Sequence, residues 1–214
     1  MKKTDTYVAV LGDVIASRRL PPRARARLQR ELQAALRTEL NRRWRPAIAA
    51  RFAIARGDEI EGLLHDAAAS AGALWDIAHW IRARFSAVDW IIAAARGPIT
   101  TALAATALEV DGPCFHEARA ALDEAKRTRQ VFVLRGFPPT TTALAGYYSA
   151  LYWSWTPRQR RTAGLLRVWD RDRDQVRERL KVHPTAVSHM KRRLAWPLVA
   201  AGDTMFRAAL LEAS

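Results

Sequence analysis

Three carboxylates in the first third of the chain stand at positions where the backbone is expected to turn. Asp13 ends an apolar run, and Asp58 and Glu59 follow Gly57 between two short apolar segments. Carboxylates that converge repel one another unless they are protonated or bridged by a cation. Mg²⁺ suits such a site, because it binds carboxylate oxygens and keeps positions open for phosphates. Asp13, Asp58 and Glu59 are therefore candidate Mg²⁺ ligands, and a plain hairpin turn with a capping Asp13 is the alternative.

The elements that must position these carboxylates follow from the apolar patterns. The patterns predict strands at 7–14, 87–95 and 130–134, a hairpin at 50–64, and helices at 22–43, 65–84 and 113–127. This order indicates a ferredoxin-like α/β sandwich of the split βαβ type with one added strand. The first strand of such a sheet lies centrally beside the hairpin, so its end approaches the hairpin turn. The Asp13 and Asp58 carboxylates are thus predicted to lie close enough to share one cation.

A second, helical part is expected after a Gly- and Pro-containing linker at 136–141. The predicted division is an α/β domain at 1–137 and a small all-α domain at 138–214. Residues 173–196 fit a helix-turn-helix, in which the second helix starts at Pro184. Its outward positions suit base edges and phosphates, although solvated Arg-rich helix pairs are common. These candidate DNA-binding residues are Thr185, Ser188, His189, Lys191, Arg192 and Arg193.

The charge of the chain points to a polyanionic partner such as nucleic acid or nucleotide phosphate. The formal net charge is +14, and half of it lies in residues 151–214. An Arg-rich composition without such a partner is the alternative. The single cysteine excludes an internal disulfide and a cysteine-based zinc site. No long apolar run and no signal-peptide pattern occur, so a cytoplasmic protein without a membrane partner is expected.

The N-terminal motifs resemble the palm domain of class III nucleotidyl cyclases and GGDEF diguanylate cyclases. In that domain the first metal aspartate ends the first strand in a pattern like Asp-Ile-x-Gly, and residues 13–16 read Asp-Val-Ile-Ala. The second metal aspartate lies in a Gly-Asp hairpin, which matches Gly57-Asp58-Glu59. The resemblance implies Mg²⁺ as the cofactor, with Lys126, Gly57 and Arg119 as the nucleotide-binding residues.

Two features of the sequence depart from the palm pattern. Arg56 replaces the second glycine of the GGDEF hairpin. The cyclase helix offers Asn and Arg to the transition state, whereas His116 and Arg119 stand out of register with those positions. There is also no clear pair for base recognition. These departures favour nucleotide binding over cyclisation.

Taken whole, the chain resembles the SatD family. The segments that carry the resemblance are GDVIASRR, GDEIEGLL, DGPCFHEAR and the C-terminal helices. Two functions remain: a nucleotide-responsive DNA-binding regulator, or an active nucleotidyl cyclase or nucleotidyltransferase that uses two-metal catalysis. Whether two chains of a homodimer share one site is left open by the sequence.

Overall fold

The centre of the protein is a five-stranded mixed sheet. The computed structural model describes residues 5–66, 68–170 and 173–212, and within them the sheet order is β2-β3-β1-β4-β5. β1, β2, β3 and β4 pair antiparallel, and β5 runs parallel to β4. The mixed α/β class is therefore confirmed. The strands are β1 (Thr6–Val14), β2 (Ile48–Arg56), β3 (Glu59–His65), β4 (Trp90–Pro98) and β5 (Phe132–Arg135).

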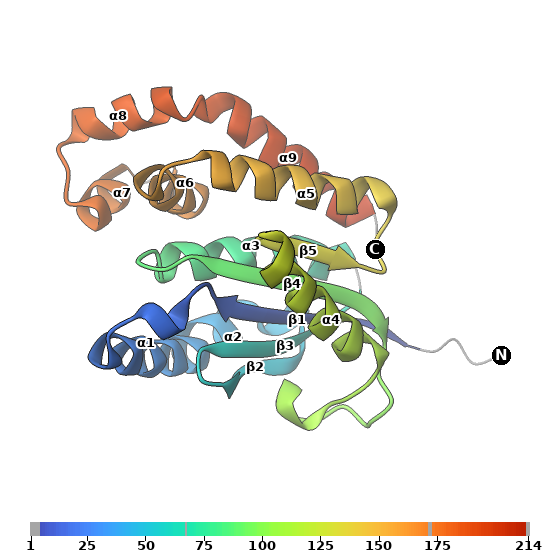
Figure 1. Ribbon diagram of the computed structural model, residues 1–214. Helices are drawn as coiled ribbons and strands as arrows, with labels where there is room; N and C mark the ends of the chain where they lie inside the picture. Colours follow the sequence, from blue (N-terminus) through green and yellow to red (C-terminus); the bar gives the residue numbers. More distant parts are fainter. Residues whose placement is uncertain (1–4, 67, 171–172, 213–214) are drawn as a thin grey trace.

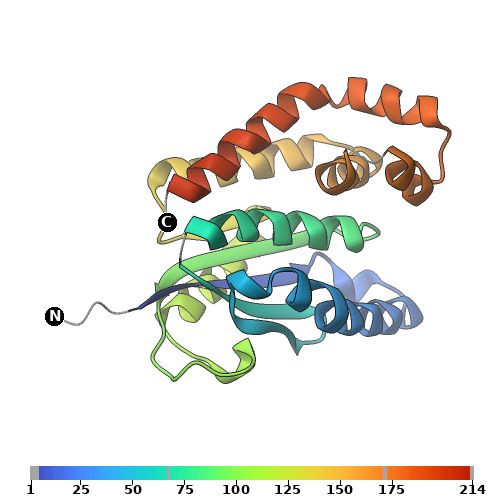
Figure 2. The ribbon, with the colours of Figure 1, turned by 180° about the vertical axis from the view of Figure 1, so that it is seen from behind.

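Helices cover both faces of this sheet. The helix α4 (Pro113–Thr128) lies on one face, which is turned to the viewer in Figure 1. The other face, seen in Figure 2, carries α1 (Pro22–Ala35) and α3 (Ala68–Arg84). The predicted helix at 22–43 widens into a π-helical segment at Leu36–Leu40 before the short α2 (Asn41–Arg43). Its leucines repeat every four residues, and those at 32, 36 and 40 are buried against the sheet.

The hairpin between β2 and β3 has the two-residue loop Gly57-Asp58. Arg56 pairs with Glu59, and Gly57 has a positive φ of 62°. Glycine adopts this conformation without steric cost, which explains its place at the first position of the loop. Gly12 of β1 pairs with Ile60 of β3, so the end of β1 comes beside the hairpin turn.

The chain after residue 138 forms a further layer of helices, at the top in both views (Figures 1 and 2). Tyr148 and Tyr152, together with Phe206 and Leu210, belong to the same buried cluster as the sheet and α3. The division at residue 137 stays a prediction, because these helices share that core. They are α5 (Pro139–Ser154), α6 (Pro157–Trp169), α7 (Arg173–Leu180), α8 (Pro184–Arg193) and α9 (Trp196–Glu212).

Helices α6, α7 and α8 contribute to a further, smaller apolar cluster beyond those on the two faces of the sheet. Leu166, Val176 and Val187 supply one buried side chain from each helix. The break between α7 and α8 falls at residues 181–183, where the sequence places the turn. The interpretation of this unit as a helix-turn-helix stays a prediction. Among the described residues, every helix falls short of the length and apolarity needed to cross a membrane.

Candidate functional site

A cavity of about 620 Å³ lies at the end of β1. Its walls come from β1 and the loop after it, from the β2–β3 hairpin, from the C-terminal end of α4 and from α5. Asp13 and Asp58 both line it, and the sharing of one cation by their carboxylates stays a prediction. The other polar or aromatic lining residues are Ser17, Arg18, Arg19, Lys126, Arg129, Gln130 and Trp153.

Asp13 is placed by the register of β1. It pairs with Ile91 of β4 and belongs to the sheet face that α4 covers. The Nζ atom of Lys126, in the last turns of α4, lies 2.9 Å from Asp13 Oδ2. The Asp13 side chain is 19% exposed and that of Lys126 is 41% exposed. Lys126, one of the predicted nucleotide-binding residues, is therefore at the cavity and neutralises the first carboxylate.

Asp58 is held more tightly than a simple loop residue. The Ser17 side chain and the backbone of Val14 and of Asp58 itself hydrogen-bond its carboxylate and lower its pKa. Burial of the carboxylate raises its pKa, and the negative charge of Asp13 raises it further to a smaller extent. The pKa of Asp58 is therefore raised overall. The Oδ2 atom of Asp58 is buried and has no hydrogen-bond partner among the described residues. The site thus contains an acidic oxygen that is unfavourable to ionise without a further positive charge.

Replacing Asp58 with Asn is expected to raise the melting temperature of the metal-free protein at pH 7 by about 1–3 °C. The pKa of Asp58 is higher in the folded protein than in the unfolded chain, so the folded state binds this proton more tightly. The ionised carboxylate therefore costs stability above the raised pKa. That cost disappears as the pH falls below the unfolded-state value of about 4.

Thermal unfolding of both proteins between pH 7 and about pH 3 measures this effect. The advantage of the Asn variant should be present at pH 7 and shrink to nothing at the acidic end. A variant that is less stable at pH 7 would contradict the expectation. It would show that the bonds from Ser17 and Val14 to the carboxylate outweigh its burial.

Four cationic side chains share the cavity with the two carboxylates. They belong to Arg18, Arg19, Lys126 and Arg129. Arg129 ends α4 in a left-handed conformation, and its carbonyl accepts a hydrogen bond from Trp153 Nε1. Its guanidinium lies 5.0 Å from the centre of the Trp153 ring. An acidic pair within a cationic wall is an arrangement that fits a bridging cation and a phosphate chain.

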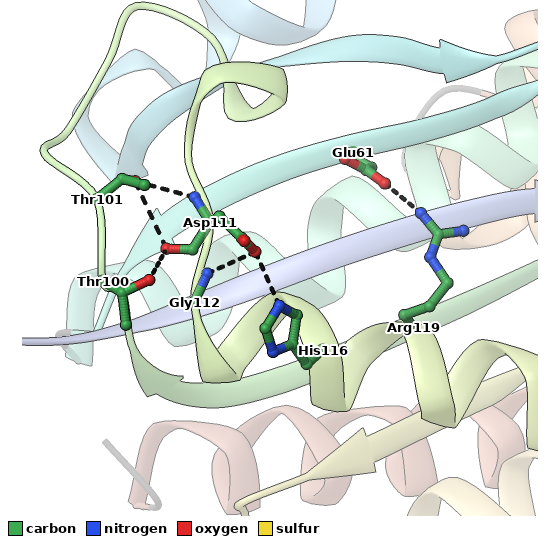
Figure 3. A network of polar contacts seen from close by, with 7 residues as sticks. All are labelled: Glu61, Thr100, Thr101, Asp111, Gly112, His116 and Arg119. Carbon is green, nitrogen blue, oxygen red and sulfur yellow. Dashed lines mark hydrogen bonds and ion pairs between the residues drawn. The ribbon is translucent and has the colours of Figure 1, made fainter.

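Glu59 lies next to this cavity without lining it. Its Oε2 atom is 2.6 Å from Arg119 Nη1, and Arg119 Nη2 also pairs with Glu61. Arg119 precedes Lys126 by seven residues, or about 10 Å along α4, so its guanidinium reaches β3 rather than the cavity. Figure 3 shows the pairing of Arg119 with Glu61. Gly57, the third predicted nucleotide-binding residue, is also absent from the cavity lining.

His116 closes the loop that precedes α4. Its Nε2 atom lies 3.0 Å from Asp111 Oδ1, and both side chains are well exposed. Asp111 Oδ1 also accepts the backbone N–H of Gly112, and the Asp111 N–H donates to Thr101 Oγ1 (Figure 3). These contacts tie the ends of the 99–112 loop together at the start of α4. His116 therefore supports the loop, two turns or more from the cavity.

The donor set fits Mg²⁺ as a partner of two carboxylates. Among the residues that the structure describes, no three His, Cys, Asp or Glu side chains are grouped so that they could hold a metal ion. Mg²⁺ is commonly bound through one or two carboxylates, with water and substrate phosphates completing its six ligands. Asp13 and Asp58 are the two carboxylates of this cavity. The buried Oδ2 of Asp58 has no hydrogen-bond partner among the described residues, whereas Oδ2 of Asp13 pairs with Lys126. Glu59 is engaged by Arg119 instead.

The predicted DNA-binding residues lie on α8. His189 and Arg193 line a groove of about 360 Å³ between α8 and α6. Lys191 is half-buried and pairs with the Asp170 carboxylate, so its charge is partly compensated. The exposed members of the set are Thr185, Ser188, His189, Arg192 and Arg193.

Several lining residues of the cavity were missed by sequence reasoning. Arg18 and Arg19 follow Asp13 in the same loop, and this proximity in the sequence was the available signal. Nothing in the sequence around Ser17 marks it as a residue of the cavity. Trp153 packs against the buried cluster of the sheet and α3 and also lines the cavity. Arg129 reaches the cavity only because α4 ends beside β1.

The fold and the site together define a mixed α/β protein with an acidic pair in a basic cavity, followed by helices with a basic outer surface. The chain belongs to the SatD family, whose family model matches residues 7–130. This range runs from β1 to just beyond α4, so Asp13, Asp58 and Lys126 fall within it. Among curated proteins, none matches the chain.

Proposed function

We propose that the protein is a nucleotide-responsive DNA-binding regulator. In this proposal the cavity at the end of β1 binds a Mg²⁺-nucleotide and α8 contacts duplex DNA. The observation that carries it is the placement of Asp13 and Asp58 in one cavity with four cationic side chains. The bound cation would be held by these carboxylates and would supply charge that offsets the phosphates. Lys126 and Arg129 would contact phosphate oxygens.

The sheet supports a palm-like interpretation of the N-terminal part. The order β2-β3-β1-β4, with antiparallel pairing throughout, is that of a split βαβ sheet. Ala16 follows β1 in a left-handed conformation with a φ of 56°. This is the position at which the palm motif has glycine, the residue that best tolerates such a φ. The loop after Asp13 therefore turns at the position where the palm motif has its glycine, which supports the comparison with a palm site.

The helical unit supports DNA binding through its core and its charge. Helices α6, α7 and α8 share one apolar cluster, as three-helix DNA-binding units do. The outer surface of α8 exposes Arg192 and Arg193, and His189 and Arg193 line the groove toward α6. Arginine side chains of this kind can contact both phosphates and guanine edges.

A short chain of contacts joins the cavity to α6. The Ile15 N–H donates to the Asp89 carbonyl at 2.9 Å. The Asp89 carboxylate accepts two hydrogen bonds from Arg160 of α6, at 3.1 and 3.2 Å. Arg160 also stacks over Trp153, 4.9 Å from the ring centre, and Trp153 lines the cavity. We expect a ligand in the cavity to act on α6, and thereby on α8, through Arg160.

Replacing Arg160 with Gln is expected to uncouple the two binding events. Nucleotide should still bind, and DNA should still bind, but nucleotide should no longer change the DNA affinity. The coupling in the natural chain is expected to be about 5–150-fold, the usual range for linked sites, and to fall to about onefold in the variant. Fluorescence anisotropy of a labelled duplex, with and without Mg²⁺-nucleotide, measures it. The control is Arg161→Gln, one residue further on α6, whose guanidinium bonds the Arg179 carbonyl.

The alternative is catalysis of nucleotidyl transfer at the same carboxylates. Arg119 is paired with Glu59 and Glu61. This pairing favours the regulator, because Arg119 is then not free to stabilise a transition state as the palm resemblance implies. An assay for pyrophosphate release from nucleoside triphosphates distinguishes the two. If the protein is the regulator, nucleoside triphosphates should bind without release of pyrophosphate. If the natural chain releases pyrophosphate and Asp58→Asn does not, the protein is the enzyme instead.

A further inference from the structure

A second cavity lies between α3 and the helices α5 and α6, and it is separate from the nucleotide site. Its volume is about 20 Å³, and four arginines line it together with a single carboxylate, Asp89. The arginines are Arg82 of α3 and Arg160, Arg161 and Arg167 of α6. Such a concentration of guanidinium groups inside a packed interface is costly unless their charge and their hydrogen bonds are compensated.

Two of the four arginines pair with carboxylates, and a third, Arg161, is exposed to solvent. Arg160 pairs with Asp89, and Arg167 pairs with Asp203 at 2.7 Å. Arg161 donates to a backbone carbonyl of α7. The carboxylates near the cavity are thus already engaged by other arginines.

Arg82 is the exception. It is only 5% exposed, and its Nη2 atom donates to the carbonyls of Trp90 and Val131. Its Nε and Nη1 atoms are buried and have no acceptor among the described residues. The neighbouring His79 adds no charge, because burial and the charges of Arg167 and Arg82 hold its pKa well below the ordinary value.

A second unpartnered donor belongs to a residue that lines the same cavity from another element. The hydroxyl of Tyr148, on α5, is buried and finds no partner among the described residues. The hydroxyl of Tyr152, one turn further on, donates to the Asp89 carboxylate. The cavity therefore receives donors without acceptors from both sides of the interface.

We propose that this cavity binds a chloride-sized anion, which joins Arg82 of α3 to Tyr148 of α5. A volume of about 20 Å³ suits one monatomic occupant, since a single water needs about 10–15 Å³, and it is too small for phosphate or sulfate. An anion accepts hydrogen bonds from several donors at once, and its negative charge offsets that of Arg82. A water molecule also accepts hydrogen bonds, but it has no charge to offset that of Arg82. The cavity is separate from the nucleotide site, although Asp89 and Arg160, which line it, also belong to the contacts that join that site to α6. The test below uses no nucleotide, so its outcome does not depend on the proposed function.

The test is thermal unfolding in sodium chloride, with sodium gluconate replacing it at constant ionic strength. The natural chain is expected to gain stability along a saturating curve in chloride or bromide. Tyr148→Phe keeps the ring packing and removes one donor, so the chloride concentration at half-saturation should rise about tenfold. Tyr147→Phe is the matched control, because this tyrosine of α5 is exposed and does not line the cavity, and it should retain the half-saturation of the natural chain.

Crystals grown in bromide give a direct second measurement. Anomalous density within hydrogen-bond distance of Arg82 and Tyr148 is the expected result. The proposal is overturned if the cavity holds only water, or if chloride and gluconate give the same stability in the natural chain. An equal chloride response in Tyr148→Phe and in the natural chain would also overturn it.

Discussion

Replacing Asp13 with Asn is expected to reduce Mg²⁺-dependent nucleotide binding by at least about a hundredfold. Loss of a residue that only supports a metal ligand commonly costs about 10–100-fold in metal affinity, and loss of the ligand itself should cost no less. The change also removes the partner of Lys126, whose Nζ lies 2.9 Å from Asp13. Isothermal titration with a nucleoside triphosphate, with and without Mg²⁺, measures the effect.

The control for this variant is Asp123→Asn. Asp123 is exposed on α4 and does not line the cavity, so the same change of charge occurs away from the site. Its nucleotide affinity should stay within about twofold of the natural value, because exposed charges at a distance are screened. Equal losses in the two variants would mean that total charge, and not the carboxylate in the cavity, governs binding.

The second large effect is expected on DNA binding. Replacing both Arg192 and Arg193 with Ala should lower the affinity for duplex DNA and reduce the slope of log affinity against log salt by about two units, or about one for each phosphate contact. Both side chains are exposed on α8. Titrations at several salt concentrations give the slope.

The matched control removes two arginines from α1. Arg23→Ala with Arg30→Ala makes the same change in net charge at two exposed positions away from α8. Its salt slope should remain that of the natural chain. If the natural chain fails to bind duplex DNA at low salt, the regulator is excluded and the catalytic alternative gains support.

The fold class and most of the elements could be predicted from the sequence because their signals are local. The alternation of apolar runs and the Gly57-Asp58 turn locate the strands around Asp13 and Asp58, and Pro184 marks the start of α8. The fourth strand begins at Trp90, three residues later than predicted. Residues 85–88 form a turn instead, in which the Val88 N–H bonds the Phe85 carbonyl.

The composition of the site was less predictable, because it depends on long-range packing. Arg119 has the residue type of a phosphate ligand, yet Glu59 and Glu61 lie within its reach on β3 and engage it. Trp153 is brought to the cavity only by the packing of α5 against the end of α4. Side-chain partners of this kind follow from how the helices lie on the sheet, which no local pattern of the sequence contains.

The most direct test of the account is a thermal-shift titration of the natural chain and Asp58→Asn with a panel of nucleotides, each with and without Mg²⁺. The natural chain should be stabilised by at least one nucleotide in a manner that requires Mg²⁺, and the variant should lose this dependence. Stabilisation at 100 times the dissociation constant amounts to about 2.7 kcal/mol, which is readily detected. If no nucleotide stabilises the natural chain, or if Asp58→Asn responds as the natural chain does, the hairpin is only a turn and the proposed site does not exist.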